Sequence, residues 1–421
     1  MRRLINSLLY RIHKIIDPPI VSLRYRRHVV RIREDVGKPK VRVLFIVSEI
    51  AKWKEQSLYE AMEKSGVFEP IVGLSAWNGQ IEELCPNDKL VKLHERAAAF
   101  FAALGDHCVN TVRIVDGKRE ISDLREFHPD IVYYTEPWSP AMGQDPRSVS
   151  RFALTCYSPY YVPNYSIIEQ ECKLDLHRWL WIYYCLGEWQ AKCYANAYIP
   201  FTRSTWFVGA GHPSLDPFYL SRDRKPVGNM VIYAPHCTIA GKGSTWPQHY
   251  ATFRWSGSFM LEYAKAHPEI KWVFKPHPLL KRGIKNVGWM SDEAIEAYYS
   301  EWRAIAAVSE DSDYQDMFLD SRVMITDCGS FLSEYGATGR PVIHLISAEN
   351  IRKPISKLAS LYDTYYKVHD LAEFKETLRQ VVEGGLDPAR AKRLEALRES
   401  GLGSVCASEN IISHLRKVLN R

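Results

Sequence analysis

Met324-Ile-Thr-Asp-Cys-Gly-Ser-Phe-Leu-Ser-Glu-Tyr-Gly-Ala-Thr-Gly-Arg-Pro-Val-Ile-His344 is the stretch that determines the fold expected for this chain. An apolar run at 323–326 predicts a strand, residues 330–337 predict a short helix, and 342–343 predict the next strand. A strand, helix and strand of this size form one βαβ unit. Because such units pair their strands in parallel, we expect an α/β protein.

The turn inside this unit, Asp327-Cys-Gly-Ser330, has the composition of an anion-binding loop. Gly329 and Ser330 open the helix at the carboxyl end of a strand, where free N–H groups and a helix-end charge of about +0.5 favour a phosphate. An ordinary helix cap is the alternative for the same residues. Glu334 follows Ser330 by one helical turn, so it is placed either to bind ribose hydroxyls or simply to face solvent.

Composition excludes several classes of protein. With 421 residues the chain is too long for one core, and we expect two or three domains. Nine cysteines without a CxxC pair predict reduced cytosolic thiols. No His, Asp and Cys residues have metal-ligand spacing, so we expect no tightly bound metal and no cofactor. No apolar run approaches the ~20 residues of a membrane-spanning helix.

The positive charge is concentrated at the N-terminus. Residues 1–34 hold nine Arg and Lys against two acidic residues, which gives them a charge of +7, and the remaining chain sums to −1 of the net +6. We therefore expect no broad nucleic-acid-binding face. Apolar residues at helical spacing over 1–16, flanked by cations, are typical of a helix lying in an anionic membrane surface, and Pro18-Pro19 is expected to end that helix.

Two other interpretations of this basic segment stay open. The helix could pack on the body of the protein or on a second subunit, which would make the chain an oligomer through its N-terminal arm. A mitochondrial transit peptide is less favoured, because Asp17 and the proline pair interrupt the pattern.

The remaining chain alternates strand and helix patterns. We expect a basic amphipathic arm at 1–38, a Rossmann-like domain at 39–205, a second one at 206–385 and closing helices at 386–421. Two Rossmann-like domains facing a cleft make a GT-B-like architecture. Residues 165–195 are predicted to be helices, with Trp179 and Trp181 in the core. Glu49 and Glu136 follow strands of the first domain and are expected on its ligand side.

Several motifs in the second half occur in an informative order. Lys275-Pro-His277-Pro278 follows a strand, and the segment from Tyr314 to Ser330 precedes Glu334 and then Arg340-Pro341. Ala234-Pro235 and the box 211–216 are weaker landmarks. Together these motifs resemble the CDP-glycerol glycerophosphotransferase family, whose members build teichoic-acid-like and capsular polyol-phosphate polymers. The resemblance covers about residues 205–350.

The sequence also departs from that family. Cys328 and Gly329 stand where the family has Tyr and Ser, and Glu334 stands where it usually has Asp. Typical members carry a histidine in a His-Gly-Thr-Pro box after a strand of the first domain. The corresponding loop here, 155–160, contains no histidine, which leaves the identity of the catalytic base open.

The resemblance implies transfer of glycerol- or ribitol-phosphate from a CDP-activated donor to a hydroxyl of a lipid-linked or cell-surface glycan, with release of CMP. The implied donor-binding residues are Lys275, His277, Asp327, Gly329, Ser330 and Glu334. The leading candidate for the base is His236, with Glu136 and Glu49 as alternatives. Such an enzyme would act in the cytoplasm, bound peripherally to the inner face of the cytoplasmic membrane.

Two alternative functions use the same donor-binding half. The first is a GT-B glycosyltransferase that takes a sugar from a nucleotide sugar, which the missing histidine favours. The second, of another class, is an inactive donor-binding scaffold subunit. The intact Lys275/His277 and Asp327/Ser330 motifs argue against the scaffold.

Overall fold

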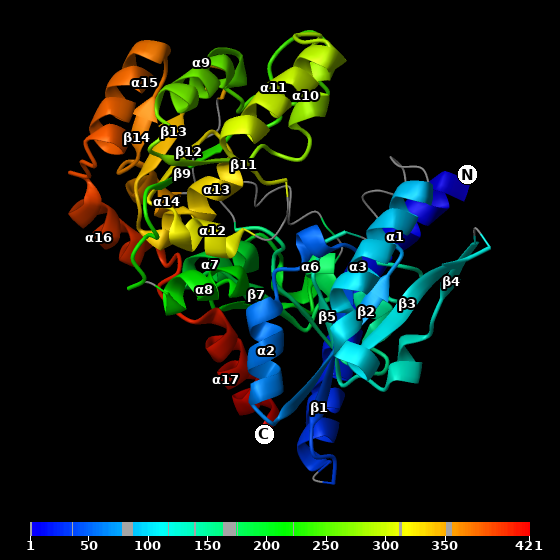
Figure 1. Cartoon of the computed structure of the whole chain (residues 1–421). Coiled ribbons are helices and arrows are strands. Elements are labelled where there is room, and N and C mark those ends of the chain that lie inside the picture. Colours follow the sequence, from blue (N-terminus) through cyan, green and yellow to red (C-terminus); the bar gives the residue numbers. More distant parts are fainter. Residues whose placement is uncertain are drawn as a thin grey trace. The chain divides into compact units, whose positions relative to one another are not determined.

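The computed structural model describes residues 2–35, 37–77, 87–116, 118–138, 140–162, 174, 176–221, 223–310, 314–350 and 356–421 (Figure 1). Parts of the predicted helical segment 165–195 lie outside these residues. Within the described part of the chain, no helix is long and apolar enough to span a membrane.

The chain forms two compact units. The described residues of unit 1 lie within Met1–Tyr161, Ile167–Asp216 and Val405–Arg421, and those of unit 2 lie mainly within Pro217–Ser404. The sequence predicted the boundary between the two Rossmann-like domains at 205/206, and the structure divides the chain at Asp216/Pro217. The last helix of the chain belongs to unit 1.

Unit 1 contains an eight-stranded sheet. Its strands are β1 (Val41–Val47), β2 (Phe68–Ser75), β3 (Cys108–Val115), β4 (Lys118–Ile121), β5 (Ile131–Tyr134), β6 (Leu154–Tyr157), β7 (Ile182–Cys185) and β8 (Trp206–Gly209). Their order in the sheet is β4-β3-β2-β1-β5-β6-β7-β8. All neighbouring strands are parallel except β3 and β4. This is the predicted Rossmann-like sheet, extended at both edges.

The helices of unit 1 cover this sheet. They are α1 (Arg2–Glu34), α2 (Gln56–Lys64), α3 (Asn87–Phe101), α4 (Pro146–Val149), α6 (Leu176–Trp179), α7 (Glu188–Asn196) and α17 (Ala407–Leu419), with 3₁₀ turns at 50–52, 102–107, 124–127, 200–202 and 213–215. α8 (Asp216–Leu220) spans the boundary between the units. Ile411, Leu415 and Leu419 of α17 join the same apolar core as β1 and β2.

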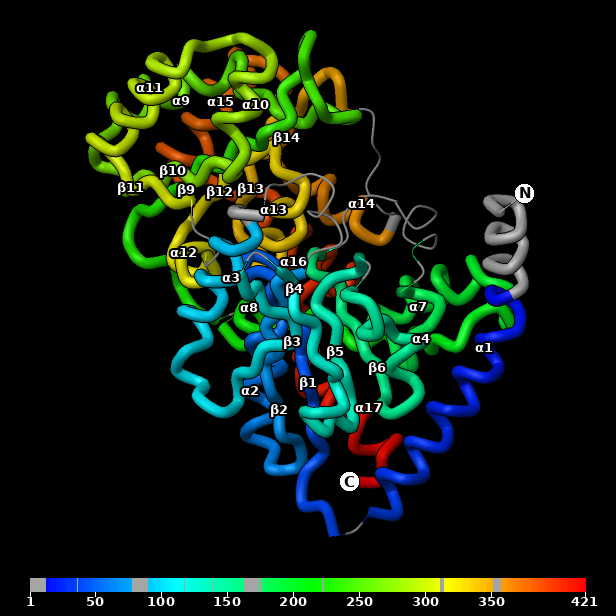
Figure 2. Tube along the Cα trace, turned by 90° about the vertical axis from the view of Figure 1, so that its right-hand side faces the viewer, coloured from blue at the N-terminus to red at the C-terminus, as the bar shows by residue number. Residues whose placement is uncertain are grey.

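The N-terminal helix corrects one expectation. α1 continues through Pro18 and Pro19, where the sequence predicted its end. A proline removes one helical N–H but keeps a helical φ, so the chain continues where packing compensates. Val21 and Tyr25 supply that packing, because both are almost fully buried and the Tyr25 hydroxyl donates to the carbonyl of Trp179 at 2.7 Å. The C-terminal half of α1 is therefore part of unit 1, beside α17 (Figure 2).

Unit 2 contains a six-stranded parallel sheet. Its strands are β9 (Met230–Ala234), β10 (Lys271–Phe274), β11 (Ala307–Val308), β12 (Val323–Thr326), β13 (Val342–Leu345) and β14 (Tyr366–Val368), in the order β11-β10-β9-β12-β13-β14. The helices are α9 (Phe253–Ala266), α10 (Leu280–Asn286), α11 (Asp292–Ile305), α12 (Gln315–Asp320), α13 (Gly329–Glu334), α14 (Ser356–Tyr362), α15 (Leu371–Thr377) with a π turn at 378–383, and α16 (Arg390–Ser400). The βαβ unit predicted at 323–343 is confirmed.

One predicted element is wrong. Residues 182–185, expected within a helical segment, form strand β7 between β6 and β8. The aromatic run around them has no clear period, so its neighbours in space decide its conformation. The prediction that Trp179 and Trp181 are core residues is confirmed, since both are less than a tenth exposed.

Candidate functional site

In unit 2, three adjacent strands deliver polar residues to one edge of the sheet. β10, β9 and β12 pair in that order, and their carboxyl ends lead into His277, His236 and Asp327. The two imidazole rings lie 4.8 Å apart between centroids. The structure therefore brings together residues that are up to 91 positions apart in the sequence.

Backbone donors fix the tautomers of both histidines. The N–H of Leu279 donates to Nδ1 of His277 at 3.1 Å, and the N–H of Thr238 donates to Nδ1 of His236 at 3.3 Å. A ring nitrogen that accepts a backbone N–H carries no proton, so in the neutral ring the proton is on Nε2. Both residues therefore offer an Nε2–H donor.

Burial keeps both rings neutral. It lowers the pKa of His277 to about 4 and that of His236 to about 3, with a further contribution from Lys275 and from His277, respectively. At neutral pH each is an uncharged hydrogen-bond donor, suited to an anionic oxygen. His236 has no free lone pair in this arrangement, so the geometry favours a donor over the predicted base.

Asp327 holds the site together from within. One carboxylate oxygen accepts from the His236 N–H at 2.6 Å, and the other accepts from the N–H and the hydroxyl of Thr252 at 2.6 and 2.8 Å. Both oxygens are thus used inside the protein, and the side chain is 3% exposed. Asp327, which the sequence predicted to bind the diphosphate, therefore positions the loop of His236 and the start of α9.

The environment of Asp327 also makes stability depend on pH. Burial raises its pKa from 3.8 to about 6, so the folded protein holds this proton at pH values where the unfolded chain releases it. The contribution of this group to the free energy of unfolding is therefore largest below about pH 4 and falls as the pH rises through about 6.

We expect Asp327→Ala to lower the free energy of unfolding by about 3 kcal/mol at neutral pH, because three buried donors lose their acceptor. The loss should appear as a lower urea midpoint in chemical denaturation. Asp316→Ala is the control, since that side chain is 89% exposed and its ion pair within the described residues is with Arg224, and it should change stability by less than ~0.5 kcal/mol. Equal effects of the two substitutions would refute the anchoring role of Asp327.

The turn after β12 leads into a short helix. α13 begins at Gly329, one residue before the predicted start at 330, ends at Glu334 and is followed by a 3₁₀ turn at 336–338. The hydroxyl of Thr326 accepts from the Cys328 N–H at 2.9 Å, which orients the turn. The amides of Gly329 and Ser330 come first in the helix and have no intrahelical acceptor.

Lys275, Tyr314 and Glu334 form a second group at this edge. The Lys275 ammonium lies 5.1 Å from the centroid of the Tyr314 ring, and the Tyr314 hydroxyl donates to Glu334. Lys275 and Glu334 are both 5% exposed. Glu334 is therefore not the solvated helix residue of the alternative interpretation. Tyr314 was not predicted as a site residue, although it opens the motif segment 314–330.

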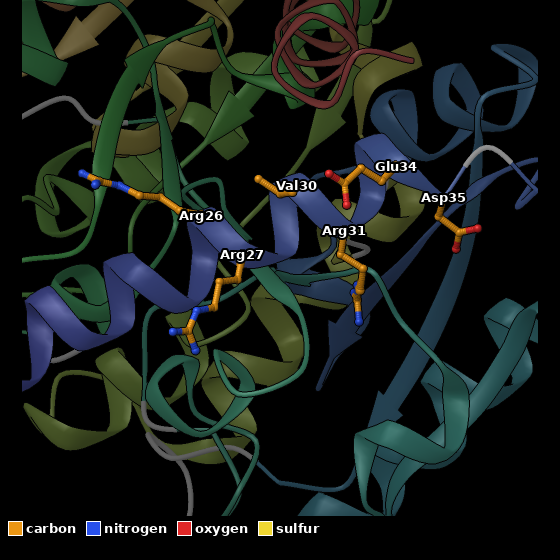
Figure 3. A pocket seen from close by; sticks show the side chains of 6 residues that line it. All are labelled: Arg26, Arg27, Val30, Arg31, Glu34 and Asp35. Carbon is orange, nitrogen blue, oxygen red and sulfur yellow. The ribbon is translucent and has the colours of Figure 1, made fainter.

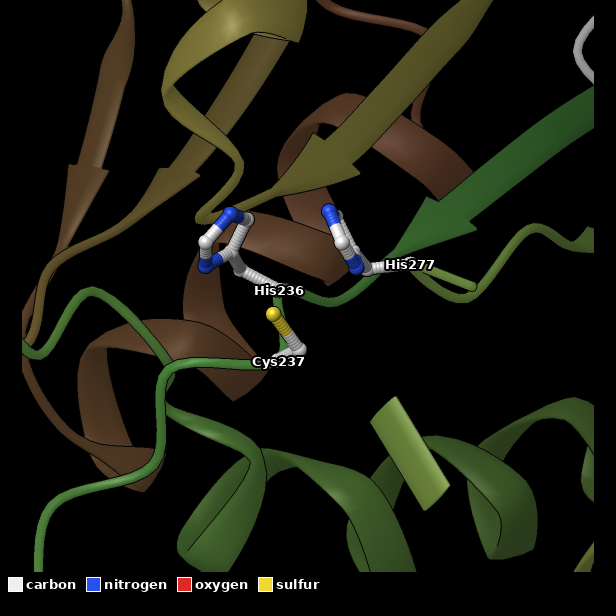
Figure 4. A group of neighbouring side chains, drawn as sticks. All are labelled: His236, Cys237 and His277. Atoms are coloured by element: carbon white, nitrogen blue, oxygen red, sulfur yellow. The ribbon is translucent and has the colours of Figure 1, made fainter. Parts of the chain in front are cut away.

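His236, Cys237 and His277 also offer donor atoms that lie within 4.8 Å of one another (Figure 4). Sequence spacing did not reveal this group, because its members come from two strands. Its chemistry does not suit a metal, since both Nδ1 atoms accept backbone N–H groups and each Nε2 holds a proton. Burial also raises the pKa of the Cys237 thiol to about 12. We interpret the group as hydrogen-bond donors.

Unit 1 has a separate polar site at the carboxyl ends of β1 and β5. These strands pair directly, so Glu49 and Glu136, which follow them, come together. Between them the Lys52 ammonium lies 2.7 Å from Glu49 and 2.8 Å from Glu136. Lys52 was missed by the sequence analysis. Its partners become visible only once the two strands are known to be neighbours.

The Glu136 carboxylate has the properties of a tuned base. Burial raises its pKa above the ordinary value of 4.5, against the opposing effects of Lys52 and Ser48. It lines a small cavity with Trp77 and Trp138, and Lys52 lies 4.3 Å from the centroid of the Trp138 ring. A carboxylate with a raised pKa beside a cavity is a candidate for proton transfer.

The box 211–216 has a structural role. His212 bonds the carbonyl of Pro159 at 2.8 Å, and Asp216 accepts from the N–H groups of Ala407 and Ser408 at the start of α17. Both residues are buried. Through these hydrogen bonds, residues 211–216 connect the loop after β6 with the start of α17.

No protein-family model and no curated protein sequence matches the chain. Solved structures do. UDP-GlcNAc 2-epimerase from Neisseria meningitidis, bound to UDP-GlcNAc, is 14% identical with a TM-score of 0.51 over 90% of this chain and all of that one. A variant of the wall teichoic acid polymerase TagF with CDPG is 12% identical, with a TM-score of 0.50 over 99% of this chain and 98% of that one.

A putative UDP-N-acetylglucosamine 2-epimerase from Listeria monocytogenes is 14% identical, with a TM-score of 0.50 over 90% of this chain and 97% of that one. The teichoic acid polymerase is a protein of the kind that the sequence motifs resemble. These similarities confirm the predicted α/β architecture: the chain has the GT-B fold that is shared by these epimerases and by TagF.

Proposed function

We propose that the protein transfers a polyol-phosphate, glycerol- or ribitol-phosphate, from a CDP-activated donor to a hydroxyl of a lipid-linked or surface glycan. The observation that carries this proposal is the pair of neutral Nε2–H donors of His236 and His277 at the sheet edge of unit 2, beside the opening of α13. Such uncharged donors at a strand end support the binding of a diphosphate.

In this reaction the acceptor oxygen forms a bond to the β-phosphorus, and the bond from that phosphorus to the oxygen of CMP breaks. Charge builds up on the leaving CMP, where His277, His236 and the amides of Gly329 and Ser330 donate hydrogen bonds. Lys275 adds a positive charge. Glu136 takes the proton of the acceptor hydroxyl, the role for which its raised pKa suits it.

A second candidate is a GT-B glycosyltransferase that uses a nucleotide sugar. It is favoured by the absence of a histidine in the loop 155–160 and by the likeness to an epimerase that binds UDP-GlcNAc. An inactive scaffold subunit is disfavoured, because the described donors remain in register around a buried Asp327.

Thermal stabilisation by CDP, UDP and GDP in parallel separates these functions. We expect CDP alone to raise the melting temperature and CDP-glycerol with a glycan acceptor to release CMP. Selective stabilisation by UDP or GDP, with release of UDP from a nucleotide sugar, would establish the glycosyltransferase instead. Stabilisation by a nucleotide without release of CMP or UDP from any donor would support the inactive donor-binding scaffold.

A further inference from the structure

The exposed face of α1 is apolar. Val21, Tyr25 and Ile32 point into unit 1, and the opposite side of the helix carries Ile16 and Leu23, which are 54% and 49% exposed. Ile20 and Val30 extend the same stripe, at 45% and 47% exposed. A helix with one face in the core and an apolar stripe on the other has a second surface to cover.

The apolar surface continues onto the body of unit 1. The 3₁₀ turn at 200–202 lies against α1, and Ile199 and Phe201 beside it are each 59% exposed. Trp206, on the edge strand β8, is 61% exposed. Two parts of the chain that are far apart in the sequence, α1 and residues 199–206, therefore contribute large exposed apolar side chains to this region.

A groove of about 390 Å³ lies beside Trp206 and is formed by α1, β7, β8 and α17. Its lining includes Val29, Val30, Trp181, Trp206 and Val418. Arg26 and Arg33 also line it. A groove lined mainly by apolar side chains, with cations beside it, is suited to a hydrocarbon chain that carries an anionic head.

The cations of α1 complete the surface. A hollow of about 590 Å³ on the helix is lined by Arg26, Arg27, Val30 and Arg31, with the carboxylates of Glu34 and Asp35 at its C-terminal end, and the guanidinium groups of Arg26 and Arg27 extend away from the helix (Figure 3). Within the described residues, neither Arg26 nor Arg27 pairs with a carboxylate, whereas Arg31 lies 3.6 Å from Asp130. Two arginines thus keep their charge available for an outside anion.

We propose that this surface, which we call the α1 face, docks the protein on a bilayer containing anionic phospholipid. Arg26 and Arg27 bind lipid phosphates, the stripe of Ile16, Ile20 and Leu23 enters the interface, and one acyl chain occupies the groove beside Trp206. The combination of exposed apolar side chains with cations that lack internal partners selects a lipid surface: a nucleic acid would leave the apolar stripe uncovered. The inference is independent of the proposed function.

The test is flotation of the full-length protein with vesicles of phosphatidylcholine, with and without phosphatidylglycerol. We expect binding only when phosphatidylglycerol is present, and weaker binding at high salt. Arg26→Gln with Arg27→Gln should weaken binding about 25-fold, at about fivefold for each cation near the surface. Trp206→Glu should weaken it by at least about tenfold, because a charge would enter the groove.

Matched controls separate the α1 face from general effects. Leu220→Glu alters a side chain that is 68% exposed but lies outside the groove, and Arg390→Gln removes an exposed cation elsewhere. Both should bind vesicles like the wild type, and all variants should keep the wild-type melting temperature. Equal binding to neutral vesicles, or equal loss in Leu220→Glu and Trp206→Glu, would overturn the proposal. A dimer in lipid-free solution that Trp206→Glu dissociates would show that a second copy covers the face instead.

Discussion

Glu136→Gln lowers turnover by about 10²–10⁴-fold while donor affinity stays unchanged, if Glu136 is the base for the acceptor hydroxyl. The amide has the same shape but cannot take a proton, and Lys52 keeps its other partner, Glu49, at 2.7 Å. Folding is expected to survive, because the raised pKa shows that burial disfavours the charged carboxylate. Turnover is measured as CMP release from CDP-glycerol, and affinity as the dissociation constant of CDP.

The pH dependence of turnover tests the role of Glu136 independently. A base works only when deprotonated, so activity is lost as the pH falls through the pKa of Glu136. Since burial raises that pKa, the acid limb should lie at higher pH than for an ordinary glutamate near 4.5, and Glu136→Gln should remove it.

Glu49→Gln is the matched control, because it changes the other carboxylate on Lys52. Glu136 lines the small cavity beside Trp77 and Trp138, whereas Glu49 is not among its lining residues, so we assign Glu49 a positioning role and expect a loss below about tenfold. Turnover of Glu136→Gln within about threefold of the wild type would remove Glu136 from the mechanism. A larger loss in Glu49→Gln than in Glu136→Gln would exchange their roles.

The sequence predicted the βαβ unit of unit 2 well, because the signals for its strand and helix are local. The strand at 323–326 is a short apolar run that leads through Asp327 and Cys328 to Gly329 and Ser330, and the pattern needs no distant partner to be recognised. The run at 182–185 lies in a long aromatic stretch without a clear period, although Gly187 follows it. Its strand conformation depends on pairing with β6 and β8, which the linear pattern does not contain.

The site shows the same limit at the level of single residues. Asp327 stands where a phosphate ligand is expected, yet three internal donors take both of its oxygens. Lys52 joins carboxylates from two strands whose adjacency is a property of the topology. His277 is the converse case, since a Lys-Pro-His-Pro motif fixes its place at a strand end and the next turn fixes its tautomer. Local motifs therefore predict single hydrogen-bond donors better than they predict networks of side chains from several strands.

Of all the site residues, His236 and His277 are those whose expected roles the structure changes most. His236 was the leading candidate for the base, but its Nδ1 accepts the Thr238 N–H, and burial lowers its pKa to about 3. A base must accept a proton at working pH, whereas a neutral Nε2–H donor serves a diphosphate at any pH above its pKa. The same argument holds for His277, with a pKa of about 4. Binding of CDP should therefore be independent of histidine titration between about pH 6 and 8.

His277→Ala accordingly lowers kcat/KM about 10²–10³-fold, the usual cost of removing one preorganised donor to a developing oxyanion. His277→Gln, whose side-chain amide can donate in place of Nε2–H, should recover activity to within about tenfold of the wild type.

His236→Ala should weaken CDP binding and leave the acid limb of the pH profile in place, because that limb belongs to Glu136. If His236→Ala instead abolishes turnover, leaves CDP affinity intact and removes the acid limb, then His236 is the base and the tautomer argument fails. Calorimetric titration with CDP and the pH dependence of CMP release distinguish the two outcomes.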